Sequence, residues 1–476
     1  MHRRNQVNES LSGDGVLAGS PHFPGMSPSR SRVIENRKQA FQTKDKLHPL
    51  IKFFMIGLVV PWIVPLGGAN FPPYRVVLLL TLLPCLASWL RGKAGPIRAV
   101  DIGVFTYCIW IGIALAATQG PATALQPSCS FFIDGFGAYL LARCYIRSAE
   151  DFSRMILFAV KLIAALLPFA LYEWITGNAI LLTIFGLVSP TVDFSNMPPR
   201  LGLFRVQGPF SHPILFGVFC GSILALVCSV TPSKRFFLGR GFSACLVAFS
   251  AMLSMSSAPL AGVLFQVGLL VWFRALGRFS WHLKVLWGLF LLCYLIVEFG
   301  SNQTPIQFYI SHFTFDTQTG WYRLLIWDYG SESVMNNPIL GIGLEDWVRP
   351  PWMASKSVDN FWLLTAMRHG LPGLLILSVS CLVLWVGLAR GPALPSALQA
   401  YRRAYLICMI TFVFVGSTVH FWAAIYSWFF FLLACGVWLL DAQRETSPDT
   451  VRALSRHARE TPAYGKSRRS NTATSS

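Results

Sequence analysis

The sequence predicts an all-α polytopic membrane protein with about 12 transmembrane helices, each of about 20 residues. Both termini are expected in the cytoplasm, and a long outer loop lies between spans 9 and 10. Three observations predict this fold class. The chain is 54% hydrophobic and only 13% charged, whereas a soluble domain is about 25% charged. Its apolar residues come in long runs that are nearly free of charge. Its Lys and Arg residues collect in alternate loops. These features exclude a set of soluble domains, a disordered chain and a fibrous protein.

The predicted spans follow from scanning for apolar runs of roughly helical membrane length. They are 50–68, 75–90, 100–118, 129–146, 154–173, 210–230, 236–255, 259–274, 284–299, 359–388, 403–420 and 422–440. Two pairs, spans 7 and 8 and spans 11 and 12, have almost no linker. The count is therefore open by one or two.

The orientation follows from the basic residues, because Lys and Arg collect in cytoplasmic loops. With the N-terminus inside, all but seven of the 39 Lys and Arg residues fall on the cytoplasmic side. Most of the net charge of +18 therefore records topology and contact with membrane lipid rather than nucleic-acid binding, which would need a basic face on a soluble domain. The seven outer cations are Arg75, Arg200, Arg205, Arg323, Arg349, Lys356 and Arg368.

Three regions are expected along the chain. Residues 1–49 and 441–476 are polar, basic tails predicted to be disordered in the cytoplasm, and residues 50–440 form the transmembrane domain. The first tail is too long for the basic region of a cleavable signal peptide, so span 1 is expected to stay as an anchor. The nine histidines are scattered, so no metal site is expected. The cysteines fall in or beside the spans, so no disulfide framework is expected either.

Two outer segments, 174–209 and 300–357, are long enough to suggest function. The first contains an apolar stretch, Ala179–Val188, and ends in R-V-Q-G-P-F-S-H-P before span 6. Arg205 is then expected at the outer surface near a helix N-terminus, where the dipole favours an anion. An arginine that extends toward lipid phosphates is an equal alternative. His212 fits a capping or packing role better than a catalytic one.

The second outer segment reads T-G-W-Y-R-L-L-I-W-D-Y-G-S-E-S-V-M-N-N-P-I-L-G-I-G from Thr319 to Gly343. Residues 321–335 are expected to form a short amphipathic helix that the Asn-Asn-Pro sequence ends. Arg323 then lies on its first turn, where a salt bridge to Asp328 is one alternative. Trp327 offers an apolar platform for a ligand, although an interfacial aromatic belt explains most such tryptophans. The two glycines allow a tight turn or a close backbone approach to a ligand.

Span 10 begins S-V-D-N-F-W-L-L-T-A-M-R-H-G-L-P-G from Ser357 to Gly373. Asp359 and Asn360 open the helix as an N-cap pair. Arg368 and His369 would lie about 14 Å further in along a regular helix. Because a charge at that depth is costly, Arg368 is expected to face a polar cavity or an acid. Alternatively, residues 359–368 form a separate interfacial piece and the span starts at Gly370.

The order of these motifs resembles the O-antigen ligase and polymerase superfamily. The resemblance rests on R-x-x-G-x-F before a span, an outer arginine followed by N-P-I-L-G-I-G, and then D-N-F-W-L-L with G-L-P-G, over about residues 200–390. It implies a multi-pass glycosyltransferase of the bacterial inner membrane, with residues 300–357 in the periplasm. Such an enzyme moves a glycan from a polyprenyl diphosphate carrier to an acceptor, which is another carrier-linked glycan or the lipid A core. No nucleotide sugar or other cofactor is implied, and other polysaccharide-assembly proteins are expected partners.

The resemblance also implies roles for site residues. Arg205 and Arg323 match the arginines thought to hold the diphosphate, and Asp359 and Asn360 stand at the expected catalytic position. Asp359 is a candidate base for the acceptor hydroxyl. His212, Arg368, His369 and Trp327 are supporting candidates.

Two departures favour a polymerase of exopolysaccharide or O-antigen over a strict ligase. Asp359 stands where ligases usually have histidine, and Ser256-Ser257 is not followed by the frequent arginine. A ligase that transfers glycan to the lipid A core remains the first alternative. A transporter or flippase of lipid-linked sugars is the second, disfavoured because no internal repeat is visible.

Overall fold

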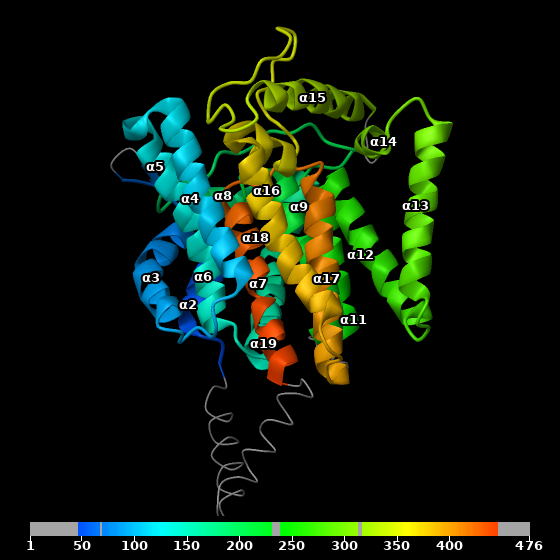
Figure 1. Cartoon of the computed structure of the whole chain (residues 1–476). Coiled ribbons are helices and arrows are strands. Elements are labelled where there is room, and N and C mark those ends of the chain that lie inside the picture. The colour runs from blue at the N-terminus through cyan, green and yellow to red at the C-terminus, as the bar shows by residue number, and fades with distance from the viewer. Residues whose placement is uncertain (1–45, 67–68, 231–238, 313–316, 446–476) are drawn as a thin grey trace, which may run out of the picture. The chain divides into compact units, whose positions relative to one another are not determined.

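The computed structural model describes residues 46–66, 69–230, 239–312 and 317–445, and most of both predicted tails lies outside these ranges. From Leu47 onward the chain forms one unit, which is mostly helical (Figure 1). Its helices are α2 (Pro49–Val59), α3 (Pro73–Leu90), α4 (Ala99–Gln119), α5 (Pro121–Phe132), the π-helical turn η1 (Ile133–Gly137), α6 (Ala138–Tyr145), α7 (Ala149–Thr176), α8 (Ile180–Gly186), α9 (Pro213–Ser222), α10 (Leu224–Val230), α11 (Arg240–Leu253), α12 (Ser257–Leu276), α13 (His282–Gly300), α14 (Pro305–His312), α15 (Thr317–Asn336), α16 (Phe361–Arg390), α17 (Ser396–Gly416), α18 (Ala424–Ala434) and α19 (Val437–Glu445). Two short antiparallel strands, β1 (Val64–Leu66) and β2 (Ala69–Phe71), connect α2 to α3.

The helices coincide with the predicted spans. Within the described residues, nine helical segments are long and apolar enough to cross a membrane. They are Pro73–Leu90, Ala99–Gln119, Ala149–Thr176, Pro213–Val230, Ser257–Leu276, His282–Gly300, Phe361–Arg390, Ser396–Gly416 and Ala424–Arg444. Helices α2 and α11 fall on predicted spans 1 and 7 but are shorter, and predicted span 4 falls on α5, η1 and α6. The structure is therefore that of a polytopic membrane protein, while the count of about 12 and the orientation stay predictions.

Local sequence explains where several helices begin and end. Proline occupies one of the first two positions of α2, α3, α5 and α9, where its missing N–H costs no hydrogen bond. Ser148 caps α7 by accepting a hydrogen bond from the N–H of Asp151. Gly177 ends the same helix in the left-handed conformation, with φ of 75°, that favours glycine.

The apolar core is built around α18, all of whose residues are buried. Helix α18 packs on α6, and α4 packs on α5 and α16. A second, smaller apolar cluster lies between α15 and α16 and includes Ile326, Val334, Leu363 and Met367. Among the nine candidate spans of the described residues, α13 alone has no buried residue. Its exposed apolar surface is what a lipid-facing helix requires.

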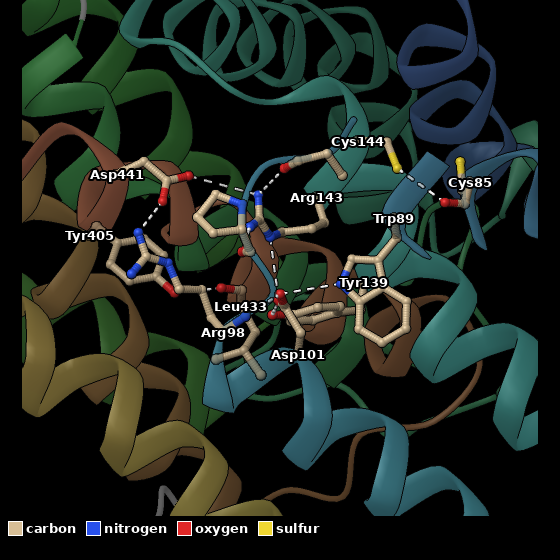
Figure 2. A network of polar contacts seen from close by, with 12 residues as sticks. Cys85, Trp89, Arg98, Asp101, Tyr139, Arg143, Cys144, Tyr405, Leu433 and Asp441 are labelled. Atoms are coloured by element: carbon tan, nitrogen blue, oxygen red, sulfur yellow. Dashed lines mark hydrogen bonds and ion pairs between the residues drawn. The ribbon is translucent and has the colours of Figure 1, made fainter. Parts of the chain in front are cut away.

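A buried polar network ties α4, α6 and α19 together (Figure 2). Asp101, which is fully buried, accepts hydrogen bonds from the Tyr139 hydroxyl at 2.5 Å and the Trp89 ring N–H at 3.3 Å, and pairs with Arg143 at 3.3 Å. Arg143 also lies 3.9 Å from Asp441, and Asp441 forms an ion pair with Arg98. Asp101 is in the first turn of α4, so this network lies at the opposite end of α4 from Gln119.

Candidate functional site

The α16 helix is broken at Gly370, and the N-P-I-L-G-I-G segment fills the break. Gly370 has non-helical dihedral angles, φ 70° and ψ 176°. The N–H of Ile342 donates to the Met367 carbonyl at 2.8 Å, and the N–H of Leu371 donates to the Pro338 carbonyl at 2.7 Å. This cross-pairing supplies partners for backbone groups that the break removes from the helix.

The glycines of these two motifs allow the backbone of the N-P-I-L-G-I-G segment to pack closely against the backbone of α16. A Cβ atom on Gly370 would overlap the carbonyl of Ile339, and one on Gly341 would overlap the backbone at Met367 and Arg368. Both glycines also have positive φ, of 70° and 72°. Sequence reasoning allowed a close approach of Gly341 and Gly343 to a ligand, and the structure shows an approach to α16 instead.

Of the two residues predicted to cap α16, Asn360 is the N-cap and Asp359 is not. The Asn360 side chain accepts a hydrogen bond from the N–H of Leu363 at 2.9 Å and is the N-cap of α16. Asp359 does not cap the helix; its Oδ1 accepts from the Ser357 hydroxyl at 2.9 Å. Asp359 is half-buried and takes part in no ion pair within the described residues. The carboxylate therefore keeps capacity to accept a further proton or hydrogen bond.

Arg323 faces Asp359 and Asn360 across a small cavity. The cavity has a volume of about 10 Å³ and is lined by Arg323, Ile326, Trp327, Asp359, Asn360, Leu363 and Ser417. Figure 1 shows α15 lying across the end of α16 where this cavity is found. We call this end of the molecule the α15 end.

The placement of Arg323 differs from the prediction in two ways. Helix α15 begins at Thr317, so Arg323 lies in the second turn and on the buried side, 6% exposed. Among the described residues no ion pair joins Arg323 to Asp328, the acid named in the alternative interpretation. The end of the helix at Asn336, before Asn337 and Pro338, is as predicted.

The loop of residues 200–212 brings two more arginines to the α15 end. The Arg205 guanidinium donates to the Ser256 hydroxyl at 3.1 Å, and Arg200 donates to the Met255 carbonyl at 2.9 Å. Met255 has an unusual positive φ of 44°. Sequence reasoning placed Arg205 at the start of α9, but its side chain reaches the start of α12, where Ser256 is the N-cap residue. The turn before α12 contains no arginine, but Arg200 and Arg205 of the 200–212 loop both contact it.

Arg205 is held in a position that is costly for an isolated cation. Within the described residues no carboxylate pairs with it, and its buried Nε has no hydrogen-bond acceptor. Burial and the neighbouring Arg200 lower the pKa of Arg205 to about 10. The guanidinium is still charged at neutral pH, and an anion beside it would relieve the cost.

Glu173 of α7 holds the 200–212 loop from inside. Its two carboxylate oxygens accept hydrogen bonds from the N–H groups of Gln207 at 2.7 Å and Gly208 at 3.1 Å. Gln207 is itself fully buried; its side chain donates to the Asp193 and Phe210 carbonyls and accepts from Ser195. The loop that carries Arg205 is therefore fixed by a buried acid.

His212 lies next to these groups and is neutral. Burial and the positive charges of Arg205 and Arg200 lower its pKa to about 4, against the opposing effect of Asp359. Its Nδ1 accepts the N–H of Ile214 at 3.1 Å, so the predicted capping role is confirmed. Because one ring nitrogen accepts, the neutral ring carries its proton on Nε2. His212 can therefore donate a hydrogen bond to a ligand but is poorly suited to act as a base.

An aromatic row connects His212 to α16. The His212 ring lies 5.9 Å from Trp422, which stacks on His420 at 5.7 Å. Burial and the charge of Arg368 lower the pKa of His420 to about 3. The Trp422 ring N–H donates to the Ser211 hydroxyl at 3.1 Å. These contacts join the 200–212 loop to the turn before α18.

Three helices point their N-termini at this region. Helix α9 starts after His212, α12 after Ser256 and α16 after Asn360. The N-terminal end of each helix carries partial positive charge from its unpaired N–H groups. Together with Arg200, Arg205 and Arg323, which we call the arginine cluster, they make this part of the α15 end electropositive.

The remaining predicted residues lie at different distances from the arginine cluster. Arg368 is partly buried and has no carboxylate partner among the described residues, so the predicted acid is absent there. Its charge acts on His420. His369 is buried, and its ring packs 5.7 Å from that of Phe131 of α5. Trp327 lines the small cavity beside Arg323.

The order of motifs and their meeting at one end can be compared with known protein families. Residues 241–378 match the family model described as O-antigen ligase. This segment of the chain is similar to the O-antigen ligase family. It runs from α11 into α16 and includes Ser256, Arg323, Asp359, Asn360 and the break at Gly370. Arg205 and His212 precede it. A search of curated proteins finds no match.

The match confirms the resemblance that the sequence motifs indicated and supports an enzyme of the O-antigen ligase and polymerase type. Sequence reasoning missed three residues that build the site: Glu173, Gln207 and Ser256. A signal existed for Glu173, because an acid within an apolar helix calls for a partner or a function.

Proposed function

We propose that this protein transfers glycan units from a polyprenyl diphosphate carrier on the periplasmic face of the bacterial inner membrane. Its preferred reaction is the polymerisation of carrier-linked units into an exopolysaccharide or O-antigen. The observation that carries the proposal is the arginine cluster, in which the half-buried Arg205 has no carboxylate partner within the described residues.

A diphosphate matches this environment. Guanidinium groups form paired, charge-assisted hydrogen bonds with phosphate oxygens and keep their charge in a dry site. The N-termini of α9, α12 and α16 add partial positive charge without adding a side-chain cation. The carrier's phosphates would therefore meet Arg205 and Arg323 with Arg200 nearby.

The chemistry assigned to the site is an inverting transfer. The acceptor hydroxyl oxygen bonds to the anomeric carbon, the bond from that carbon to the diphosphate oxygen breaks, and the hydroxyl proton passes to Asp359. The arginine cluster stabilises the negative charge that develops on the departing diphosphate. The Nε2–H of His212 is available as one more donor to an oxygen of the substrate.

The first experiment replaces the arginines. Arg205→Ala and Arg323→Ala are each expected to abolish glycan transfer while the protein still inserts in the membrane. Arg205→Lys should keep only part of the activity, because an ammonium cannot form the bidentate contact. Arg91→Ala is the control, since that side chain is exposed and forms no ion pair within the described residues. Full activity in both arginine-to-alanine variants would refute diphosphate binding here.

The second experiment separates the reactions. In a deletion strain, single repeat units on the carrier or at the cell surface indicate a polymerase. Full-length polymer stranded on the carrier, with an unmodified lipid A core, indicates a ligase, the alternative that the family match keeps open. Movement of lipid-linked sugar across liposomes by purified protein, with no glycosidic bond made, would instead identify a transporter.

A further inference from the structure

A second, larger cavity lies beside the C-terminal half of helix α15, whereas Arg323 lies in the N-terminal half of this helix. Its volume is about 380 Å³, and we call it the α15 cavity. It lies between the C-terminal half of α15, the segment 336–348 and Thr118 near the end of α4. It is lined by Thr118, Tyr329, Glu332, Ser333, Asn336, Asn337, Gly341, Ile342, Glu345, Asp346, Trp347 and Val348. The proposed transfer chemistry uses none of these residues.

Four polar side chains that line the α15 cavity make no hydrogen bond within the described residues. Ser333 is only 9% exposed, yet its hydroxyl has no hydrogen-bond partner among the described residues. Glu332, Asn336 and Glu345 are exposed, and their side chains likewise make no hydrogen bond in the described chain. These polar groups are free to form hydrogen bonds with a polar ligand. Carboxylate, amide and hydroxyl groups together match the mixed donors and acceptors of sugar hydroxyls.

Aromatic residues complete the wall. Tyr329 is half-buried and Trp347 is 6% exposed. Trp347 is fixed by its ring N–H, which donates to the Lys356 carbonyl at 3.2 Å, and by the Arg349 guanidinium 5.3 Å from its ring. Rigid aromatic walls with a few convergent polar groups are typical of small-molecule sites.

The charge of the lining selects the ligand class. Three carboxylates line the α15 cavity, and the lining contains no Lys or Arg. Asp346 is neutralised by Arg349 at 2.5 Å and Lys356 at 3.3 Å, but Glu332 and Glu345 have no such partner. The cavity therefore repels anions, in contrast to the arginine cluster. It suits a neutral or an amino sugar and disfavours a uronic acid.

The position along α15 relates the two sites. Ser333 follows Arg323 by ten residues, which is about 15 Å along a regular helix. A glycan whose diphosphate lay at the arginine cluster would need to extend over a few sugar rings to reach the α15 cavity. The helix thus connects a cationic site at one end with an acidic, hydroxyl-binding cavity at the other.

We propose that the α15 cavity is a subsite for a neutral or amino sugar ring of the glycan. The inference rests on the proposed function for the origin of that sugar. Binding of the sugar itself does not depend on transfer. Recognition there would set which repeat unit the enzyme accepts, while the arginine cluster recognises only the carrier.

The test measures sugar binding without transfer. The full chain, purified in detergent, is mixed with methyl glycosides of a neutral hexose, an N-acetylhexosamine, a hexosamine and a hexuronic acid, and saturation-transfer NMR reports contact. At least one neutral or amino glycoside is expected to bind, and the uronic acid at least tenfold more weakly. Ser333→Phe, which fills the cavity, and Glu332→Gln should each weaken binding at least fivefold.

The controls separate this inference from the proposed function. Asp328→Asn changes an exposed acid one turn earlier on α15, outside the cavity, and should bind sugar as the unchanged protein does. The double variant Arg205→Ala, Arg323→Ala should lose transfer but keep sugar binding. The inference is overturned if no glycoside binds, if the uronic acid binds best, or if both cavity variants bind normally. Glu332→Gln keeps the test valid if Ser333→Phe does not fold.

Discussion

Replacement of Glu173 by glutamine tests whether the buried acid positions the 200–212 loop. Glu173 accepts two backbone hydrogen bonds, at 2.7 and 3.1 Å, and is only 2% exposed. A buried N–H group left without an acceptor costs about 1 to 3 kcal/mol. The amide keeps one acceptor oxygen, but its NH₂ group would face the second N–H, that of Gly208 or Gln207. We therefore expect a loss of about 1 to 3 kcal/mol of stability.

The consequence for function is larger than the consequence for folding. Because the released loop carries Arg205, glycan transfer per folded molecule should fall at least tenfold in Glu173→Gln, together with a drop of several degrees in the melting temperature in detergent. Glu150→Gln is the matched control, since this exposed acid lies in the first turn of the same helix. Transfer is measured from glycan chain length on gels, normalised to monodisperse protein. Unchanged transfer and melting temperature in Glu173→Gln would refute the positioning role.

Three further predictions concern the same end of the molecule. Asp359→Asn should abolish transfer while the melting temperature stays close to that of the unchanged protein. Asn360→Ala removes the cap of α16 and should cost about 1 kcal/mol of stability. The reverse pattern would contradict the assigned roles. The depressed pKa of His212, about 4, means that the unfolded chain takes up a proton first as pH falls from about 6.5 to 4, so thermal stability should decrease over that window and decrease less in His212→Gln. Gly370→Ala should prevent accumulation of folded protein, because the new Cβ would overlap the carbonyl of Ile339; normal yield on size-exclusion chromatography would show that the α16 break is dispensable.

Much of the fold could be predicted because the signals are local. A run of apolar residues of membrane length forms a helix wherever it is placed in lipid, since its backbone groups must pair within the segment. Proline and asparagine likewise act on their own helix, so the end of α15 before Pro338 could be read from the sequence. The start of α9 at Pro213 could be predicted for the same reason, because proline favours the first turn of its own helix.

The site could be predicted only in part. Arg205 and Arg323 stood out because few Lys and Arg residues fall in the predicted outer segments, and Asp359 stood out because of its motif. The structure brings these three residues to one end. The partners of these residues are distant in the sequence. Arg205 meets Ser256, and Glu173 meets Gln207, through packing of separate helices.

The sequence by itself determined the class of protein, the course of its helices and the few outer cations, because hydrophobic runs and charge placement are properties of short segments. Tertiary structure decided what the motifs do. It paired the backbone around Gly341 with the backbone around Gly370, and it made Asn360, not Asp359, the N-cap of α16. It also formed the α15 cavity from segments that include Thr118. Such outcomes depend on which backbones approach closely, and that is set by the packing of the whole chain.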